Sequence, residues 1–535
     1  MTNLEQFISQ YVTERDSSLF ATDIQNNFDA LTNAIGGKTM LVIGGAGSIG
    51  SSFIKACLQF KPKSLVVVDV NENGLAELTR DLRSTKGMFV PEDYVPYPIN
   101  YASNVFEKMF RSRGGFDIVA NFSAHKHVRS EKDIYSVEAL LQNNVLSAKK
   151  LLDLLSEFPP EEYFCVSTDK AANPVNIMGA SKRIMEDVIF AYSDKFPVKT
   201  ARFANVAFSN GSLPAGFIDR LSKLQPISAP SDVKRYFVSP QESGQICMLA
   251  CMLGKNREIY FPKLEEKKMK TFSSIATDFL NENGYEVLEC SSDEEAIEKA
   301  EELKSGSKKY PVHYSGSDTT GEKAYEEFFT DSEQTDMNQF ISLGVVTNRV
   351  ARPVSEIQNL FTQLEVAFSK VDTTKSEIVK ILKDFLPNFE HEEKGKSLDG
   401  KMWGHSMEKI IVVYGASNTG KTTTINDTYN KLMNKGAQVR ENPTFIDDSN
   451  DFEAVVEYKE KSIAINSLGD LRKHVDEVVR RYSDYDILIT ALNEGFACVS
   501  ADWLRNSNII CKVSKTVAND TENNSTLKLI MSLIN

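Results

Sequence analysis

The chain has 535 residues, of which 41% are hydrophobic and 25% charged, a composition and length that fit two or three globular domains. Its net charge of −13 argues against a nucleic-acid partner, because the neutralisation of phosphates requires a basic face. No apolar run reaches the roughly 20 residues that span a bilayer, and the polar N-terminus is unlike a signal peptide. The seven scattered cysteines include no C-x-x-C pair, a pattern that fits a reducing compartment, so we expect a cytoplasmic protein. Without an apolar span, we expect no membrane partner.

Residues 1–37 are expected to form an N-terminal extension of short amphipathic helices. From Lys38 onwards, apolar strands alternate with helical stretches. The expected strands are TMLVIGG, SLVVVDV, FDIVANFSA and YFCVST. This alternation predicts a Rossmann-type, doubly wound parallel sheet over residues 38–350. The alternation loosens between about 202 and 345, which indicates a smaller substrate-binding part.

The second half of the chain differs in character from the first. The charged run SSDEEAIEKAEELKSGSKK predicts a solvated surface helix. Residues 351–406 carry two apolar-periodic helices and then a polar linker. A second α/β unit is expected over residues 407–535, with strands at IIVVY, SIAINSL and YDILITAL.

A glycine-rich loop with the spacing G-x-x-G-x-x-G follows the first expected strand and opens a helix, whose free N–H groups favour phosphates. Asp69 ends the next strand, where a carboxylate accepts hydrogen bonds from ribose hydroxyls and repels a 2′-phosphate. NAD is therefore favoured, although Arg80 and Arg83 are near enough in sequence to leave NADP open. The expected cofactor ligands are Gly44, Gly47, Ser48, Ile49, Gly50, Asp69, Ser123 and Lys182.

The stretch from Ser167 to Lys182 carries the expected catalytic groups. YFCVST predicts a buried strand that brings Thr168, Asp169 and Lys170 to the carboxyl edge of the sheet, where ligands of open α/β folds lie. A carboxyl group beside an amine forms an acid–base pair. Such a pair indicates oxidation coupled to elimination rather than hydride transfer alone.

Several separated motifs occur in one order. They are GGAGSIG, AHKHV, the Thr168–Lys170 triplet, MGASK, KRYFVSP, SDTTGEKAYEEFF and FLPNFEHEEKGKSLDGKM. With these motifs, residues from about 14 to 404 resemble the nucleoside-diphosphate-N-acetylhexosamine 4,6-dehydratases. These enzymes are extended short-chain dehydrogenases of bacterial surface-glycan and nonulosonic-acid biosynthesis, in the polysaccharide biosynthesis protein family.

The resemblance implies a reaction in which NAD takes a hydride from sugar C4, water leaves across C5 and C6, and the hydride returns to C6. Asp169 would then protonate the leaving hydroxyl, Lys170 would be the base at C5, and Lys182 would hold the nicotinamide ribose. A lysine can be a base only where its pKa falls from about 10.4 towards neutrality, which burial or a nearby cation achieves.

Met178 stands where the catalytic tyrosine of this family is expected, four residues before Lys182. A thioether takes no proton from the C4 hydroxyl. A subset of these dehydratases likewise has methionine at this position. The resemblance therefore implies an active enzyme in which Thr168 orients the C4 hydroxyl and Asp169 and Lys170 carry the proton transfers.

The same resemblance implies that Lys126, Asn205 and Arg235 bind a nucleotide-sugar substrate. Arg235 matches an arginine that clamps the diphosphate, a bidentate task suited to a guanidinium group. UDP is the expected carrier, and GDP and the stereochemistry at C5 stay open. Assembly into a homo-oligomer is expected by resemblance alone.

A second nucleotide motif, G-x-x-x-x-G-K-[ST], follows the strand IIVVY. Its backbone N–H groups would cradle the phosphates of ATP or GTP, and Thr422 would hold Mg²⁺. Catalysis would need an acid after a neighbouring strand, and the candidates are Asp470, Glu494 and Asp447–Asp448. The expected phosphate ligands are Gly415, Asn418, Thr419, Gly420, Lys421, Thr422 and Thr423.

Three functions fit these observations. The leading prediction is an NAD-dependent sugar-nucleotide 4,6-dehydratase, a hydro-lyase, fused to a P-loop domain. A nucleotide-sugar 4-epimerase shares the fold and the first oxidation, but epimerisation needs no proton delivery at C6. A non-catalytic NAD-binding regulator is the third alternative, and Met178 is its main support.

Overall fold

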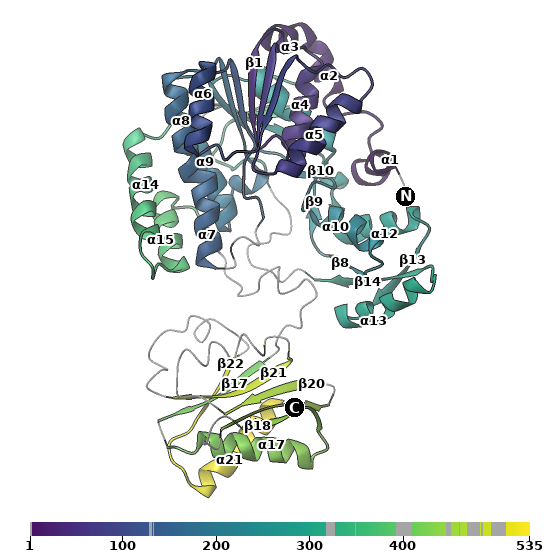
Figure 1. Ribbon diagram of the computed structural model, residues 1–535, viewed down its shortest axis with the longest axis vertical. Coiled ribbons are helices and arrows are strands. Elements are labelled where there is room, and N and C mark those ends of the chain that lie inside the picture. The colour runs from purple at the N-terminus through teal and green to yellow at the C-terminus, as the bar shows by residue number, and fades with distance from the viewer. Residues whose placement is uncertain are drawn as a thin grey trace. The chain divides into compact units, whose positions relative to one another are not determined.

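The computed structural model divides the chain into two compact units, Met1–Lys394 and Gly395–Asn535 (Figure 1). In the first unit it describes residues 3–127, 131, 133–316, 327–347 and 349–391. In the second unit it describes residues 409–416, 418–445, 451–459, 461–467, 482, 485–493 and 510–534. Among all these residues, no helix combines the length and the apolar character needed to cross a membrane.

A nine-stranded sheet forms the centre of the first unit, in the order β15-β16-β11-β6-β5-β4-β1-β2-β3. The order β3-β2-β1-β4-β5-β6 and the parallel pairing confirm the predicted Rossmann arrangement. The antiparallel strand β16 (Leu343–Val346) and the short β15 (Thr335–Asp336) extend one edge. The parallel strands are β1 (Thr39–Ile43), β2 (Ser64–Val68), β3 (Asp93–Tyr97), β4 (Ile118–Asn121), β5 (Glu162–Val166), β6 (Val198–Ala201) and β11 (Ile259–Pro262).

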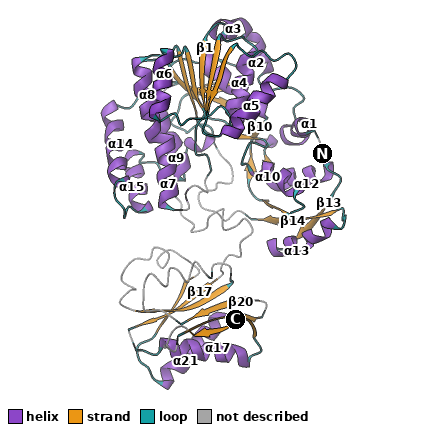
Figure 2. Cartoon of the chain, viewed as in Figure 1, coloured by secondary structure: helices purple, strands orange, loops and turns teal. Residues whose placement is uncertain are grey.

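Helices cover both faces of this sheet, which explains why its strands are almost continuously apolar (Figures 1 and 2). One face carries α4 (Ser48–Leu58), α5 (Glu72–Ser84) and α11 (Pro240–Leu253), and a Cβ at Gly244 of α11 would collide with the backbone of Ser52 in α4. The other face carries α6 (Asn104–Arg113), α7 (Ile134–Leu141), α8 (Ser147–Glu157) and α9 (Ile177–Phe190). A π-helical turn, Gln142–Leu146, joins α7 to α8.

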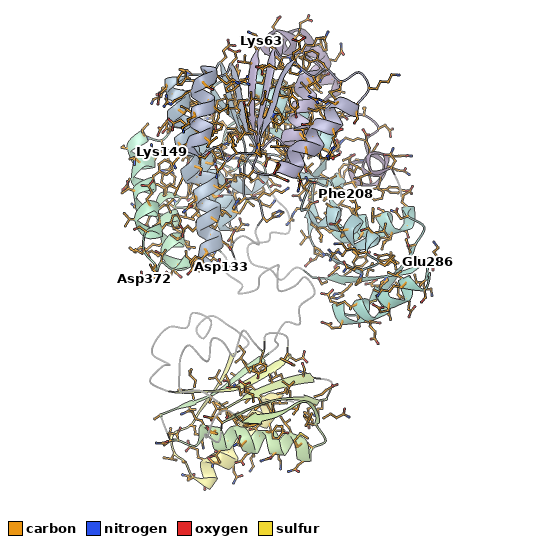
Figure 3. All side chains as sticks on the ribbon, in the orientation of Figure 1. Lys63, Asp133, Lys149, Phe208, Glu286 and Asp372 are labelled. Carbon is orange, nitrogen blue, oxygen red and sulfur yellow. The ribbon has the colours of Figure 1, made fainter. Side chains whose placement is uncertain are left out.

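Residues 202–345 are divided between two cores. Strands β11, β15 and β16 belong to the main sheet, whereas β8 (Ile227–Pro230), β13 (Glu286–Cys290) and β14 (Lys309–Ser315) form a separate three-stranded sheet. The helices α10 (Leu213–Ser222), α12 (Phe272–Glu282) and α13 (Asp293–Lys304) accompany it. The N-terminal extension takes part in this second core, because Phe7 of α1 (Leu4–Phe7) contacts Phe208 and Phe279. Figure 3 marks the position of Phe208.

The helices α14 (Val354–Phe368) and α15 (Lys375–Phe385) confirm the two helices predicted after the sheet. Their apolar residues, among them Leu364 and Leu382, join the main core. Arg352, just before α14, pairs with Asp187 of α9 at 3.1 Å. This helical pair is therefore part of the first unit and not a free linker.

The second unit has a six-stranded sheet in the order β18-β19-β20-β21-β17-β22. Four strands are parallel, namely β17 (Lys409–Gly415), β20 (Lys461–Asn466), β21 (Ile487–Asn493) and β22 (Ile510–Ser514). The antiparallel strands β18 (Gln438–Phe445) and β19 (Phe452–Tyr458) were absent from the prediction. The helices α17 (Lys421–Asn434) and α21 (Asp520–Ile534) pack against each other.

Candidate active site

The glycine-rich loop lies between β1 and α4, where the sequence predicts it. Gly44 has a φ of +73°, and a Cβ there would lie 2.6 Å from the backbone nitrogen of Ser123. A Cβ at Gly50 would collide with the carbonyl oxygen of Gly44. Both positions therefore require glycine. Helix α4 begins at Ser48, so the first N–H groups of the helix, which generally favour anions, lie at this end of β1.

The Asp69 carboxylate connects this loop to the second strand. Asp69 follows β2, and its Oδ2 accepts a hydrogen bond from the backbone N–H of Ala46 at 3.0 Å. Its Oδ1 accepts one from the N–H of Asn71 at 2.9 Å. Gly47, the next residue after Ala46, is the N-cap of α4. The half-buried Asp69 therefore lies beside the glycine-rich turn that precedes α4.

Ser123 and Lys126 follow β4, the strand beside β1. The N–H of Ser123 donates to Asn121 Oδ1 at 2.9 Å. Lys126 Nζ donates to the carbonyl oxygen of Asn210 at 2.8 Å, and the N–H of the same Asn210 donates to Ser48 Oγ at 2.8 Å. An expected cofactor ligand and an expected substrate ligand are thus brought together through one residue.

Thr168, Asp169 and Lys170 follow β5, next to the strand that delivers Ser123. Asp169 is 4% exposed, and its Oδ1 accepts three hydrogen bonds: from Thr168 Oγ1 at 2.7 Å, from the Lys170 N–H at 2.9 Å and from Lys170 Nζ at 3.1 Å. Hydrogen bonds to Asp169 Oδ1 therefore join the three side chains.

Helix α9 begins beside this triplet. Asn176 caps it by accepting from the N–H of Gly179, and Met178, which is 2% exposed, packs in the main core. Lys182 is buried, and its Nζ donates to the carbonyl oxygen of Val166, the last residue of β5, at 3.0 Å. Burial lowers the pKa of Lys182, so its proton is held less tightly than that of a solvated lysine.

Asn144 is a polar residue of the site that sequence reasoning missed. It lies in the π-helical turn, its Oδ1 accepts from the His125 N–H at 2.8 Å, and its Nδ2 donates to Ser181 Oγ at 3.0 Å. It therefore joins the loop after β4 to α9. The polar run Gln142-Asn143-Asn144 within an otherwise apolar helix was the available signal, and π-turns are frequent at functional sites.

Glu131 connects α9 to the helices that follow the sheet. Its Oε1 accepts from the Met178 N–H at 2.9 Å, and its carbonyl oxygen accepts from Lys375 Nζ at 2.8 Å. His391 Nε2 lies 3.7 Å from Glu131 Oε2, and both residues are buried. We name Glu131, Met178, Lys375 and His391 the α9 junction.

The other expected substrate residues lie on short strands. Asn205 is in β7 (Asn205–Val206), which pairs with β10 (Phe237–Val238). Arg235, in β9 (Lys234–Arg235), is 5% exposed, and its Nη1 donates to the carbonyl oxygen of Lys234 at 2.9 Å. Burial and this hydrogen bond restrict the orientation of the Arg235 guanidinium group.

The loop with the G-x-x-x-x-G-K-[ST] spacing connects β17 to α17, so the predicted strand and helix on either side of it are present. Lys421 is 7% exposed, and its Nζ donates to the carbonyl oxygens of Gly415 and Ala416 at 3.0 and 2.7 Å. Asn418 and Gly420 adopt left-handed backbone conformations, with φ of +64° and +81°.

The remaining P-loop residues complete the turn into α17. Thr419 Oγ1 donates to the Ala416 carbonyl at 2.9 Å, whereas Thr423 is exposed. Thr422 Oγ1 donates to Asp451 Oδ1 at 2.9 Å. The acids proposed from the sequence, Asp447–Asp448, Asp470 and Glu494, lie outside the described residues.

A family model described as "Polysaccharide biosynthesis protein" matches residues 40–347. An uncharacterized membrane protein of Methanocaldococcus jannaschii is 32% identical over 259 residues, which cover 47% of this chain and 74% of that protein. The probable polysaccharide biosynthesis protein EpsC of Bacillus subtilis is 26% identical over 306 residues, which cover 57% of this chain and 47% of EpsC.

A UDP-N-acetylglucosamine 4,6-dehydratase (inverting) of Campylobacter jejuni is 26% identical over 242 residues, which cover 44% of this chain and 69% of that enzyme. Among solved structures, Pen from Bacillus thuringiensis shares 20% identity with a TM-score of 0.47, and the match covers 62% of this chain and 98% of Pen.

Proposed function

The chain belongs to the polysaccharide biosynthesis protein family, and from this premise we propose that its first unit is an NAD-dependent nucleotide-sugar 4,6-dehydratase. The observation that carries the proposal is the hydrogen-bonded chain of Thr168, Asp169 and Lys170 at the carboxyl end of β5. The substrate class is a nucleotide-activated N-acetylhexosamine, with UDP as the expected carrier and GDP as the alternative. NAD, when bound, accepts the hydride from C4 and returns it to C6.

The glycine loop and Asp69 suit the cofactor. The N–H groups at the start of α4 would hold its pyrophosphate, and Asp69 would accept hydrogen bonds from its adenosine ribose. Lys182, fixed by the Val166 carbonyl at the end of β5, would donate to the nicotinamide ribose. The glycine loop and Asp69 follow β1 and β2, and Lys182 reaches the carboxyl end of β5 of the same sheet from α9.

Thr168 and Asp169 can take the proton of the C4 hydroxyl in the first step. Thr168 Oγ1 would accept that proton while its own hydrogen passes over 2.7 Å to Asp169 Oδ1. Asp169 then carries the proton that the leaving hydroxyl needs. Met178 cannot accept the C4 hydroxyl proton that the tyrosine expected at this position would take. The short relay through Thr168 and Asp169 would replace that tyrosine.

The Asp169 carboxylate beside Lys170 Nζ favours the ammonium form of the lysine until Asp169 takes up the proton from Thr168. Lys170 would then act in its amine form and remove the proton from C5, while Asp169 protonates the C6 hydroxyl, which leaves as water. Lys170 then holds the proton that C5 regains when the hydride arrives at C6. Two protons are removed from the sugar and two are used, so the triplet ends each cycle in its starting state. General acid–base catalysis of this kind contributes about 10²–10⁴-fold to a rate.

Incubation of the full-length protein with NAD and either UDP-GlcNAc or GDP-GlcNAc tests the proposal by mass spectrometry. A product lighter by one water molecule, with new keto absorbance, supports a dehydratase. An unchanged mass with an inverted C4 indicates the epimerase, and no turnover favours a non-catalytic NAD-binding regulator.

We also propose that the second unit binds ATP or GTP with Mg²⁺. The support is the glycine-rich turn between β17 and α17 and the buried Lys421, whose ammonium group lies within the loop. Titration of a fluorescent (mant) nucleotide into the full-length protein tests this second activity, and Lys421→Ala should abolish the binding.

A further inference from the structure

The carboxylate that contacts the P-loop threonine belongs to Asp451, and we propose that Asp451 and Thr422 together hold the Mg²⁺ of the bound nucleotide. The inference rests on nucleotide binding by the second unit, proposed above. Thr422 is the second residue of α17, directly after Lys421. Its Oγ1 donates to Asp451 Oδ1 at 2.9 Å.

The topology of the sheet explains how Asp451 reaches this position. Strands β17 and β20 are both parallel to β21, so their carboxyl ends lie at the same edge. Strand β19 is antiparallel to β20, so its amino end lies at that edge. Asp451 directly precedes β19 and therefore stands beside the P-loop, although it does not follow a parallel strand.

Ser467 fixes the Asp451 carboxylate in place. This residue directly follows β20 and is 2% exposed. Its Oγ donates to Asp451 Oδ1 at 3.0 Å and accepts from the Phe452 N–H at 2.8 Å, and its own N–H donates to the Phe452 carbonyl at 3.1 Å. Asp451 is therefore a positioned acid and not a mobile surface carboxylate.

The charges around the loop favour a divalent cation at this position. A carboxylate within hydrogen-bond distance of Thr422 would repel a triphosphate held in the P-loop, because like charges so close are unfavourable. A Mg²⁺ ion between them converts this repulsion into attraction. Thr422 gives its hydrogen to Asp451, so the lone pairs of its oxygen can face the metal, and Mg²⁺ prefers such hard oxygen ligands.

The test compares wild type, Asp451→Asn and Glu453→Gln by mant-ATP and mant-GTP binding with Mg²⁺ and with EDTA. Glu453 is the matched control, because it lies two residues further along the chain in β19 and its Oε1 accepts from Asn466 Nδ2 of β20 at 2.8 Å. In the presence of Mg²⁺, Asp451→Asn should bind the mant-nucleotides at least about tenfold more weakly than wild type, a loss typical of substitutions around a metal site. Its affinity in EDTA should stay equal or rise.

Electron paramagnetic resonance of Mn²⁺, with the unlabelled nucleotide present, gives a second readout. Wild type and Glu453→Gln should bind one Mn²⁺ tightly, and Asp451→Asn and Thr422→Ala should not, whereas Asp451→Glu should regain part of the signal. Unchanged Mg²⁺ dependence and Mn²⁺ binding in a folded Asp451→Asn protein would overturn the inference alone. Failure of the wild type to bind any nucleotide would overturn both the inference and the nucleotide-binding proposal.

Discussion

The substitution Glu333→Gln tests the buried ion network that supports the catalytic segment. Arg202 is completely buried, and it pairs with Glu186 of α9 at 2.6 Å and with Glu333 at 2.8 Å. Ser167, which directly precedes Thr168, donates to Glu186 Oε1 at 2.6 Å. The substitution keeps the size of the side chain and removes one of the two negative charges that face Arg202.

The cost of Glu333→Gln in folding free energy can be worked out both from the pKa of Glu333 and from the typical cost of breaking a buried ion pair. Burial alone would raise the pKa of Glu333, but the hydrogen bonds and charge of Arg202 outweigh it and lower the pKa from 4.5 to about 2. At about 1.4 kcal/mol per pH unit, this difference corresponds to about 3 kcal/mol of folding free energy. The loss of one partner from a buried ion pair likewise costs about 3–5 kcal/mol.

The lowered pKa of Glu333 also determines how the stability difference depends on pH. Because folding lowers the pKa of Glu333, its contribution to stability is complete above about pH 4.5 and is lost as the pH falls towards 2. The difference in stability between wild type and Glu333→Gln should therefore be about 3 kcal/mol at pH 7. At pH 3 it should be less than half of that value.

Amide hydrogen exchange of β5 and α9, resolved by mass spectrometry, measures the opening free energy of the first unit by itself. The matched control is Glu157→Gln, which breaks the exposed pair between Arg111 and Glu157 and should cost at most about 1 kcal/mol. A Glu333→Gln protein within about 1 kcal/mol of wild type at pH 7, or a difference independent of pH, would show that the Glu333 charge does not stabilise the first unit.

Two further predictions concern the first unit. In the dehydration assay, Thr168→Val and Lys170→Ala should each lower kcat by about 10²–10⁴-fold. Met178→Leu should change kcat little, because that side chain packs in the core. Full activity of Lys170→Ala would contradict the assignment of Lys170 as the base. Gly50→Ala should weaken NAD binding in a calorimetric titration, since its Cβ would collide with the glycine loop, but Gly216→Ala, which has no atom within 4 Å of its added Cβ, should bind like wild type.

Local patterns were sufficient to predict the Rossmann sheet. The run TMLVI followed by glycines, and SLVVV followed by Asp69, identify strands and the residues at their carboxyl ends. Parallel topology then brings those ends together, so the positions of Asp69 and Thr168 at one edge followed from the order of the elements. The two strands β15 and β16 were not predicted, since antiparallel pairing with β11 depends on distant partners.

The acids of the second unit show where local reading fails. The acid that assists the P-loop was expected after a parallel strand, whereas Asp451 precedes the antiparallel strand β19, which was not predicted. Glu131 was missed for a related reason, since its importance comes from contacts with residues 47 and more than 200 positions away. For both Asp451 and Glu131, the contacting residues are distant in the sequence, so no pattern beside either acid indicates them.

The α9 junction sets the minimal length of a working first unit. The family match ends at residue 347, but Lys375 and His391 contact the same Glu131 whose carboxylate holds the first turn of α9. A protein truncated at the family boundary would keep every expected cofactor and catalytic residue, yet it would lack two of the four members of the junction. The shortest fragment that preserves the active-site helix as it is in the whole chain therefore extends to His391.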